Sequence, residues 1–157
     1  ERLLVDAKVT DTTAAPIAAT IDVWHADGEG LYDVQHPGYT ASAPAMRARF
    51  VAGDDGRFSF RTIVPRSYPV PTDGPVGELL RAGNRHAMRP AHIHFLIRAP
   101  GFETLVTHVF IAGDSYLSCD AVFGVKPSLI AEIAPPGPPD EPGLHRLRYH
   151  FALKGLS

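Results

Sequence analysis

The sequence predicts an all-β protein: an antiparallel β-sandwich with one short helix and long ordered loops. Proline and glycine together make up nearly one in five of the 157 residues. The average is about 12%, and both residues interrupt helices. Several short segments alternate apolar and polar residues, which is typical of half-buried strands. Hydrophobic residues make up 45% of the chain and charged residues only 20%, so the turns join elements of a core and do not indicate disorder.

Four segments of the first half have strand character: residues 3–9, 21–25, 46–51 and 57–63. Residues 26–44 contain several turn residues and no period, so they predict a long loop. The last two strands flank Gly53-Asp54-Asp55-Gly56, which indicates a β-hairpin. Residues 64–74 carry several prolines and predict an ordered irregular loop.

The second half predicts the helix and the remaining strands. Asp73 is a candidate N-cap, Pro75 stands near the first turn, and Gly83 ends the helix. Residues 128–133 fit either a strand or a helical turn, and residues 135–142 form a proline-rich loop. The clear strands of this half are residues 92–99, 104–111 and 146–153.

Length and charge narrow the class of protein. The length predicts a single domain over residues 1–157. A net charge of −2 without a basic run argues against a nucleic-acid partner. No apolar stretch approaches the roughly 18–20 residues that span a bilayer, so no membrane span is expected. The single Cys119 fits a reducing compartment. We therefore expect a cytoplasmic protein, with a trimmed signal peptide before Glu1 as the alternative.

The sharpest local feature is the pair His92 and His94, in the run RPAHIHF at residues 89–95. In a strand, positions i and i+2 share a face, so both imidazoles point the same way and can bind one metal ion. Ile93 and Phe95 then point to the core. For this motif alone, metal binding and chance alternation are about equally good explanations.

Two tyrosines in other loops are further candidates for metal ligands. Tyr32 lies in the run GEGLYD. Tyr68 lies between Pro65, Pro69 and Pro71, which restrict its backbone because proline fixes φ and constrains the residue before it. Taken singly, a tyrosine is more often a packing residue than a ligand.

Taken together, these segments resemble the intradiol ring-cleavage dioxygenases, which are non-haem ferric enzymes that split catechols between the two hydroxyl-bearing carbons. The matching motifs follow the order of the family: residues 23–26 with Gly30 and Tyr32, residues 63–65 with Tyr68, Pro71 and Gly74-Pro75, residues 89–95, and residues 112–114. The resemblance implies a catalytic domain whose cofactor, Fe(III), is bound by Tyr32, Tyr68, His92 and His94. It implies that a small aromatic diol and dioxygen give a muconate-type diacid, in aromatic hydrocarbon catabolism.

The resemblance also implies catalytic roles for two residues. Tyr68 is the tyrosinate that the substrate displaces, and it acts as a base toward the diol. Arg89 faces the substrate ring, where a fixed cation stabilises negative charge. The ligand set agrees with this chemistry, because ferric iron and phenolate oxygen are both hard.

Two further motifs predict the branch of the family. The run THVF at residues 107–110 carries His108 where the catechol branch has glutamine. With the run DAVFGVK at residues 120–126, it resembles the hydroxyquinol 1,2-dioxygenases more than the catechol 1,2-dioxygenases. His108 is expected to hydrogen-bond near a metal ligand. The positions that match the substrate pocket are Val70, Pro71, Val122 and Arg89.

Members of this branch carry a helical dimerisation segment before the catalytic domain, and we expect it to be absent from this sequence. The oligomeric state is therefore open. One alternative is a cupin-like H-x-H metal dioxygenase with His108 as a third histidine ligand. The other is a transthyretin-like sandwich that binds a ligand without catalysis. Trp24 is expected in the core, and the remaining histidines are expected at the surface or at strand edges: His25, His36, His86, His145 and His150.

Overall fold

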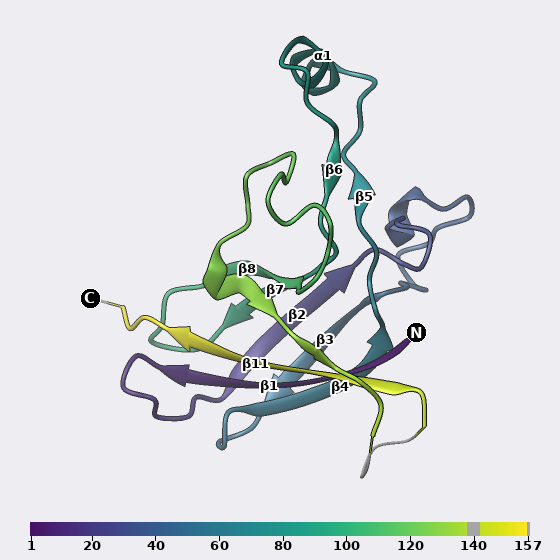
Figure 1. Cartoon of the computed structure of the whole chain (residues 1–157). Helices are drawn as coiled ribbons and strands as arrows, with labels where there is room; N and C mark the ends of the chain where they lie inside the picture. The colour runs from purple at the N-terminus through teal and green to yellow at the C-terminus, as the bar shows by residue number, and fades with distance from the viewer. Residues whose placement is uncertain (138–141, 157) are drawn as a thin grey trace.

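Two β-sheets pack face to face in the computed structural model, which describes residues 1–137 and 142–156 (Figure 1). One sheet has the strand order β10 (Ile133–Ala134), β11 (Leu144–Leu153), β1 (Arg2–Asp11) and β4 (Arg57–Ile63). The other has the order β3 (Arg47–Ala52), β2 (Ala19–His25), β7 (His92–Arg98), β8 (Leu105–Ile111) and β9 (Ile130–Ala131). The predicted β-sandwich is confirmed.

An arm stands away from the two sheets and carries the helix at its tip (Figure 1). The arm consists of the paired strands β5 (Tyr68–Pro69) and β6 (Met88–Arg89), and the helix is α1 (Pro75–Ala82). Two 3₁₀ turns, η1 (Asp33–Gln35) and η2 (Pro127–Leu129), lie in the long loops. The predicted helix and its end at Gly83 are confirmed, but Asp73 is not its cap. Gly74, directly before Pro75, is the N-cap and makes no side-chain cap bond.

Strand direction differs from the prediction at two places. Most neighbouring strands pair antiparallel, but β1 pairs with β11, and β8 with β9, in parallel. No short hairpin joins either pair, so no turn imposes the antiparallel direction. The first and last strands of the chain therefore lie side by side in one sheet.

The predicted hairpin between β3 and β4 is wrong. β3 pairs with β2 in one sheet, and β4 pairs with β1 in the other. The turn at residues 53–56 therefore crosses between the layers. Gly56 has φ +70°, and its carbonyl accepts a hydrogen bond of 2.8 Å from the Val9 N–H of β1. Sequence alternation cannot distinguish the two arrangements, because both strands turn apolar residues toward the same core.

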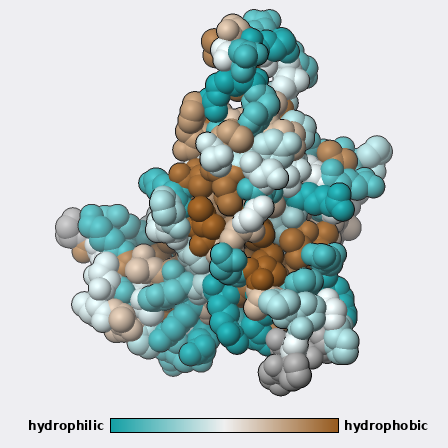
Figure 2. All heavy atoms as spheres, in the orientation of Figure 1, coloured by the Kyte–Doolittle hydropathy of each residue, from teal (hydrophilic) through white to brown (hydrophobic). Residues whose placement is uncertain are grey.

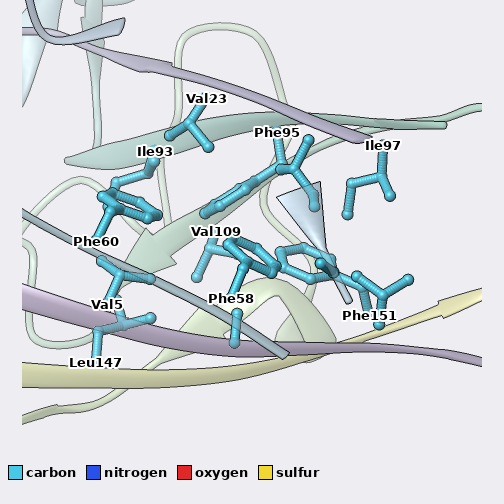
Figure 3. Close-up of a cluster of buried hydrophobic side chains, with 14 of the residues drawn as sticks. Val5, Val23, Phe58, Phe60, Ile93, Phe95, Ile97, Val109, Leu147 and Phe151 are labelled. Carbon is cyan, nitrogen blue, oxygen red and sulfur yellow. The ribbon is translucent and has the colours of Figure 1, made fainter. Parts of the chain in front are cut away.

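The core lies between the two sheets. Figure 3 shows side chains of one sheet facing those of the other, and the rings of Phe95 and Phe151 lie 4.8 Å apart between centroids. Ile93, Phe95 and Ile97 of β7 are all completely buried in it, as predicted. The alternating side chains of β7 therefore point to its outer face, away from this core.

Two residues at the end of β2 lie opposite to their predicted positions. Trp24, expected in the core, stacks on His94 with ring centroids 4.9 Å apart and ring planes within 4°. His25, expected at the surface, is 2% exposed, with Nε2 2.6 Å from Thr62 Oγ1 and Nδ1 2.7 Å from the Ala26 carbonyl. Burial lowers the pKa of His25. Val23 points into the core, and successive residues of a strand face opposite sides, so Trp24 must point outward and His25 inward.

One face of the molecule is mostly polar. Figure 2 shows a largely hydrophilic face with hydrophobic atoms gathered near its middle. On the second sheet, Asp22 accepts hydrogen bonds from Arg49 Nε (2.6 Å) and Arg98 Nη1 (3.0 Å), which lie on the strands at either side. Within the described residues, no helix is long and apolar enough to cross a bilayer.

Gly56→Ala is expected to lower the free energy of unfolding by about 2 kcal/mol or more. A Cβ here would overlap the Val9 carbonyl oxygen, and φ is left-handed. Urea unfolding measures the difference. Gly53→Ala, in the same turn, is the control: its nearest neighbour would be 3.8 Å away and its φ is not left-handed. Equal losses in the two variants would contradict this account of the turn.

Candidate metal centre

Four polar side chains converge on the outer face of β7. The Tyr32 and Tyr68 hydroxyl oxygens lie 2.8 Å apart, and Tyr68 Oη lies 3.4 Å from His92 Nε2. The His92 and His94 Nε2 atoms lie 3.0 Å apart, and His94 Nε2 lies 3.0 Å from Tyr32 Oη. The loop after β2, the arm and β7 supply these groups. The structure thus brings together the four side chains that the sequence predicted as ligands.

An ion pair between a buried carboxylate and an exposed arginine lies beside Tyr32. Asp33 is 6% exposed, and Arg47 of β3 donates from Nε to its Oδ2 over 2.7 Å. The backbone N–H groups of Val34 and Ala45 also donate to this carboxylate. The Arg47 guanidinium holds the pKa of Asp33 below its usual range. The pair ties the long loop after β2 to the sheet next to Tyr32.

Gly30 lets this loop approach the arm closely. It has φ +84°, and a Cβ on it would lie only 3.1 Å from the Cβ of Tyr68. A side chain here would push the loop that carries Tyr32 away from Tyr68. Gly30 therefore serves both as a left-handed turn residue and as the point of contact between the two tyrosine segments.

The arm brings a phenol and a guanidinium to the same place. Tyr68 of β5 and Arg89 of β6 lie directly opposite each other in the strand pairing. Arg89 is 7% exposed and donates from Nη1 to His92 Nε2 over 3.1 Å. Pro65 before Tyr68 is buried and Pro69 after it is exposed. The fixed φ of both prolines limits the paths that the arm can take.

Both histidines are neutral near pH 7. Burial lowers the pKa of His92 to about 3, and burial together with the neighbouring His92 lowers that of His94 to about 2. His92 Nδ1 lies 2.6 Å from the Pro90 carbonyl, which only accepts hydrogen bonds. Its proton is therefore on Nδ1, and Nε2 presents a lone pair to the site. Burial raises the pKa of Tyr32 well above its usual value.

The four donor atoms fit one hard cation. Two donors about 2.1 Å from one ion, at an angle of about 90–109°, are roughly 3.0–3.4 Å apart. The distances between neighbouring donors here run from 2.8 to 3.4 Å. Neutral imidazoles supply lone pairs, and a directly bound cation would counter the raised pKa of Tyr32. Phenolate oxygen suits ferric iron better than it suits a soft metal.

His108 of β8 lies directly opposite His94 of β7. The centroid of its ring is 5.0 Å from that of His94 and 5.4 Å from that of His92. Burial lowers its pKa, with Arg89 as a second cause. Its Nδ1 is buried and has no hydrogen-bond partner among the described residues. His108 thus reaches the site through ring packing, and its predicted hydrogen bond near a ligand stays a prediction.

The predicted substrate-pocket residues lie on two segments. Val122 is 47% exposed, and its N–H donates to Asp120 Oδ1 over 3.3 Å. Val70 follows Tyr68 on the arm and donates from its N–H to the Ala87 carbonyl. Pro71, the next residue, is exposed. Their contact with a substrate stays a prediction.

Two residues of the site were not expected from the sequence. Asp120 is 3% exposed and lies 3.3 Å from Arg89 Nε. Its place at the start of the DAVFGVK run was the available signal, but nothing local related it to Arg89. Trp24 was missed because its alternation was interpreted in the wrong sense, although it covers the His94 ring.

A family described as dioxygenase matches residues 1–155. A 6-chlorohydroxyquinol 1,2-dioxygenase of Cupriavidus pinatubonensis is 51% identical over 154 residues, which cover 98% of this chain and 54% of that protein. A hydroxyquinol 1,2-dioxygenase of Rhizobium sp. is 53% identical over 133 residues, which cover 84% and 45%. The chain belongs to the intradiol ring-cleavage dioxygenase family.

Solved structures of intradiol dioxygenases share the fold. A hydroxyquinol 1,2-dioxygenase of Pseudomonas putida superposes with a TM-score of 0.84 at 41% identity, over 99% of this chain and 57% of that one. A 3-chlorocatechol 1,2-dioxygenase of Rhodococcus opacus gives 0.89 at 32% identity, over 99% and 61%. This chain spans about half the length of the relatives it matches. Intradiol dioxygenases use non-haem iron. Because the chain belongs to this family, it is not a cupin-like H-x-H dioxygenase.

Gly30→Ala is expected to cost about 1 kcal/mol more in the free energy of unfolding than Gly38→Ala. Both glycines lie in the loop after β2 with nearly equal φ, +84° and +83°. Only Gly30 faces a neighbour, the Tyr68 side chain, whereas a Cβ at Gly38 would meet nothing within 4 Å. Denaturant unfolding of the two variants isolates the contact from the backbone strain. Indistinguishable losses would show that Gly30 does not hold the tyrosine segments together.

Proposed function

We propose that this chain is the catalytic part of an intradiol dioxygenase that cleaves a catechol-type ring with dioxygen to give a muconate-type diacid. The observation that carries the proposal is the convergence of two phenols and two neutral imidazoles with neighbouring donors 2.8–3.4 Å apart. Family membership supports the reaction class. One core shared by both sheets supports a single domain over residues 1–157.

Tyr32, Tyr68, His92 and His94 are the residues that would hold Fe(III). Bound there, ferric iron supplies a Lewis acid that activates an aromatic diol toward dioxygen. Two contacts hold the imidazoles on the sides that face away from the donor atoms. The Pro90 carbonyl accepts a hydrogen bond from His92 Nδ1, and the Trp24 ring covers one face of His94. These contacts orient the nitrogen lone pairs before any substrate binds.

Tyr68 and Arg89 act on the substrate. The Tyr68 phenolate oxygen accepts a proton from one diol hydroxyl, which raises the electron density of the ring. Its position on the arm, outside both sheets, suits a residue that changes partners during the reaction. The Arg89 guanidinium, directly opposite Tyr68, stabilises the negative charge that develops on the ring. Its burial strengthens this interaction, because the field of a cation is less screened in low dielectric.

The favoured substrate is hydroxyquinol, benzene-1,2,4-triol, ahead of catechol. Relatives named for hydroxyquinol or chlorohydroxyquinol are 53% and 51% identical, whereas a catechol 1,2-dioxygenase of Candida albicans is 39% identical over 132 residues. His108 occupies the position that differs between the branches and packs on both ligand histidines. A cytoplasmic location is part of the proposal, since Cys119 is a free thiol.

The iron-loaded protein is expected to be red to burgundy, because tyrosinate bound to ferric iron absorbs visible light. Tyr32→Phe and Tyr68→Phe are each expected to weaken and shift this band, and visible spectroscopy with iron analysis measures it. Tyr149→Phe is the control, since its hydroxyl donates to the Ser128 carbonyl away from the site. A colourless protein with a full complement of iron would contradict the four-ligand site.

Oxygen uptake is expected to be faster with hydroxyquinol than with catechol. A polarographic oxygen electrode measures both rates on the same iron-loaded sample, and product spectra identify ring cleavage. Equal rates would remove the preference for hydroxyquinol. Reversible diol binding without oxygen uptake would instead favour the non-catalytic binding sandwich.

A further inference from the structure

Arg89 is a buried cation whose charge is balanced by one carboxylate. It is 7% exposed, Asp120 is 3% exposed, and Arg89 Nε lies 3.3 Å from Asp120 Oδ1. Arg89 Nη1 lies 3.1 Å from His92 Nε2. Arg89 Nη2 is buried and has no hydrogen-bond partner among the residues that the structure describes. The ion pair thus engages the guanidinium at Nε, whereas Nη1 extends to His92 at the candidate metal site.

Asp120 is itself held in one orientation by the loop that follows it. Its Oδ1 accepts from the Val122 N–H over 3.3 Å, and its Oδ2 accepts from the Gly124 N–H over 2.8 Å. Arg85 Nη2 donates to the Asp120 main-chain carbonyl over 3.0 Å. Three hydrogen-bond donors therefore fix the residue that balances Arg89, and a carboxylate so restrained gives its partner little freedom.

A side chain at Gly124 would crowd the ion pair. A Cβ on Gly124 would lie 3.1 Å from Asp120 Oδ2, 3.3 Å from Arg89 Nη2 and 3.4 Å from His108 Nε2. Gly124 does not have a left-handed φ. Close packing on the ion pair, and not backbone conformation, is therefore the reason for the missing side chain.

The same loop holds an aromatic residue in an unusual backbone conformation. Phe123 has φ +55° and is 78% exposed. Left-handed backbone is strained for a bulky residue, and such strain persists where the surroundings determine it. The Arg85 guanidinium lies 3.8 Å from the centroid of the Phe123 ring. Arg85 thus binds the loop at both Asp120 and Phe123, which keeps the carboxylate facing Arg89.

We propose that Asp120 is the positioning residue of Arg89, and that residues 120–124 are built to hold it. Asp120 holds the guanidinium so that Nη1 reaches the candidate metal site, where a bound diol would develop negative charge. This inference rests on the proposed ring-cleavage function, and it adds the residue that orients the charge-stabilising arginine. It also connects Val122, a predicted substrate contact, to Arg89 through one carboxylate.

Asp120→Asn in the iron-loaded full chain is expected to lower kcat about 10–100-fold while KM changes less. Iron content and the visible tyrosinate band should stay as in the wild type. In an Arg89→Ala background, the same substitution should lower kcat no further, because Asp120 acts through Arg89. Multiplicative losses in the double variant would overturn the proposal. Asp22→Asn, which removes a surface carboxylate bound to arginines, is the matched control.

Gly124→Ala tests the same idea with the charge pair intact. The added methyl should displace Arg89 and Asp120 by a few tenths of an ångström and lower kcat severalfold, without loss of iron. Gly155→Ala is its control, since a Cβ there would meet nothing within 4 Å and φ is not left-handed. A Gly124→Ala variant with wild-type kcat would count against the positioning of Arg89 by Asp120, even if Asp120→Asn proved too unstable to purify.

A readout independent of activity separates this inference from the proposed function. In ¹⁵N-arginine-labelled full chain loaded with gallium(III), the Arg89 Nε–H should give an exchange-protected NMR signal. The signal should be lost or exchange faster in Asp120→Asn and persist in Asp22→Asn. An unchanged signal in Asp120→Asn would overturn the positioning role. An inactive wild type with the expected signals would contradict the ring-cleavage proposal alone.

Discussion

The alternation of side chains along β7 is the constraint on which the candidate metal centre depends. Ile93, Phe95 and Ile97 are completely buried between the sheets, so the residues between them must face outward. Exposing the inward set would forfeit roughly 1.5–3 kcal/mol per side chain, which makes a shift of register by one residue prohibitive. His92 and His94 thus have a fixed direction because the hydrophobic core sets it. The core thus decides which face of β7 carries the two imidazoles, and the Pro90 carbonyl and the Trp24 ring then orient them.

Two long segments outside β7 carry Tyr32 and Asp120 to the site, and a buried carboxylate paired with an arginine holds each of them. Asp33 with Arg47 fixes the Tyr32 segment, and Asp120 with Arg89 fixes the opposite side. In both pairs an arginine balances the charge of a buried carboxylate. Isolated buried charges would be costly, and these pairs distribute that cost over several hydrogen bonds.

Sequence patterns predicted the helix and the longer strands, and the family resemblance implied the four side chains that converge. They failed where two arrangements bury the same residues. The strands on either side of residues 53–56 have the spacing of a hairpin, yet they lie in different sheets. Both arrangements turn the apolar side chains of these strands toward the same core, so the sequence pattern is the same in either case. Trp24 and His25 exchanged their expected places for a related reason. In an alternating strand, burying one residue turns the next residue outward. Tryptophan is the more hydrophobic of the two, so Trp24 was expected inside, but His25 is the residue that is buried.

Periodicity and motif spacing therefore establish the sandwich, the direction of the histidine strand and the resemblance to intradiol dioxygenases. These properties are local, or they follow motifs that occur in order along the chain. The parallel pairing of β1 with β11 and the ion pair of Asp120 with Arg89 are not local properties of the sequence. They join segments that are distant in sequence, and their energies depend on burial and on atoms brought within hydrogen-bond distance. Packing in three dimensions is what creates that proximity, so only the folded structure shows it.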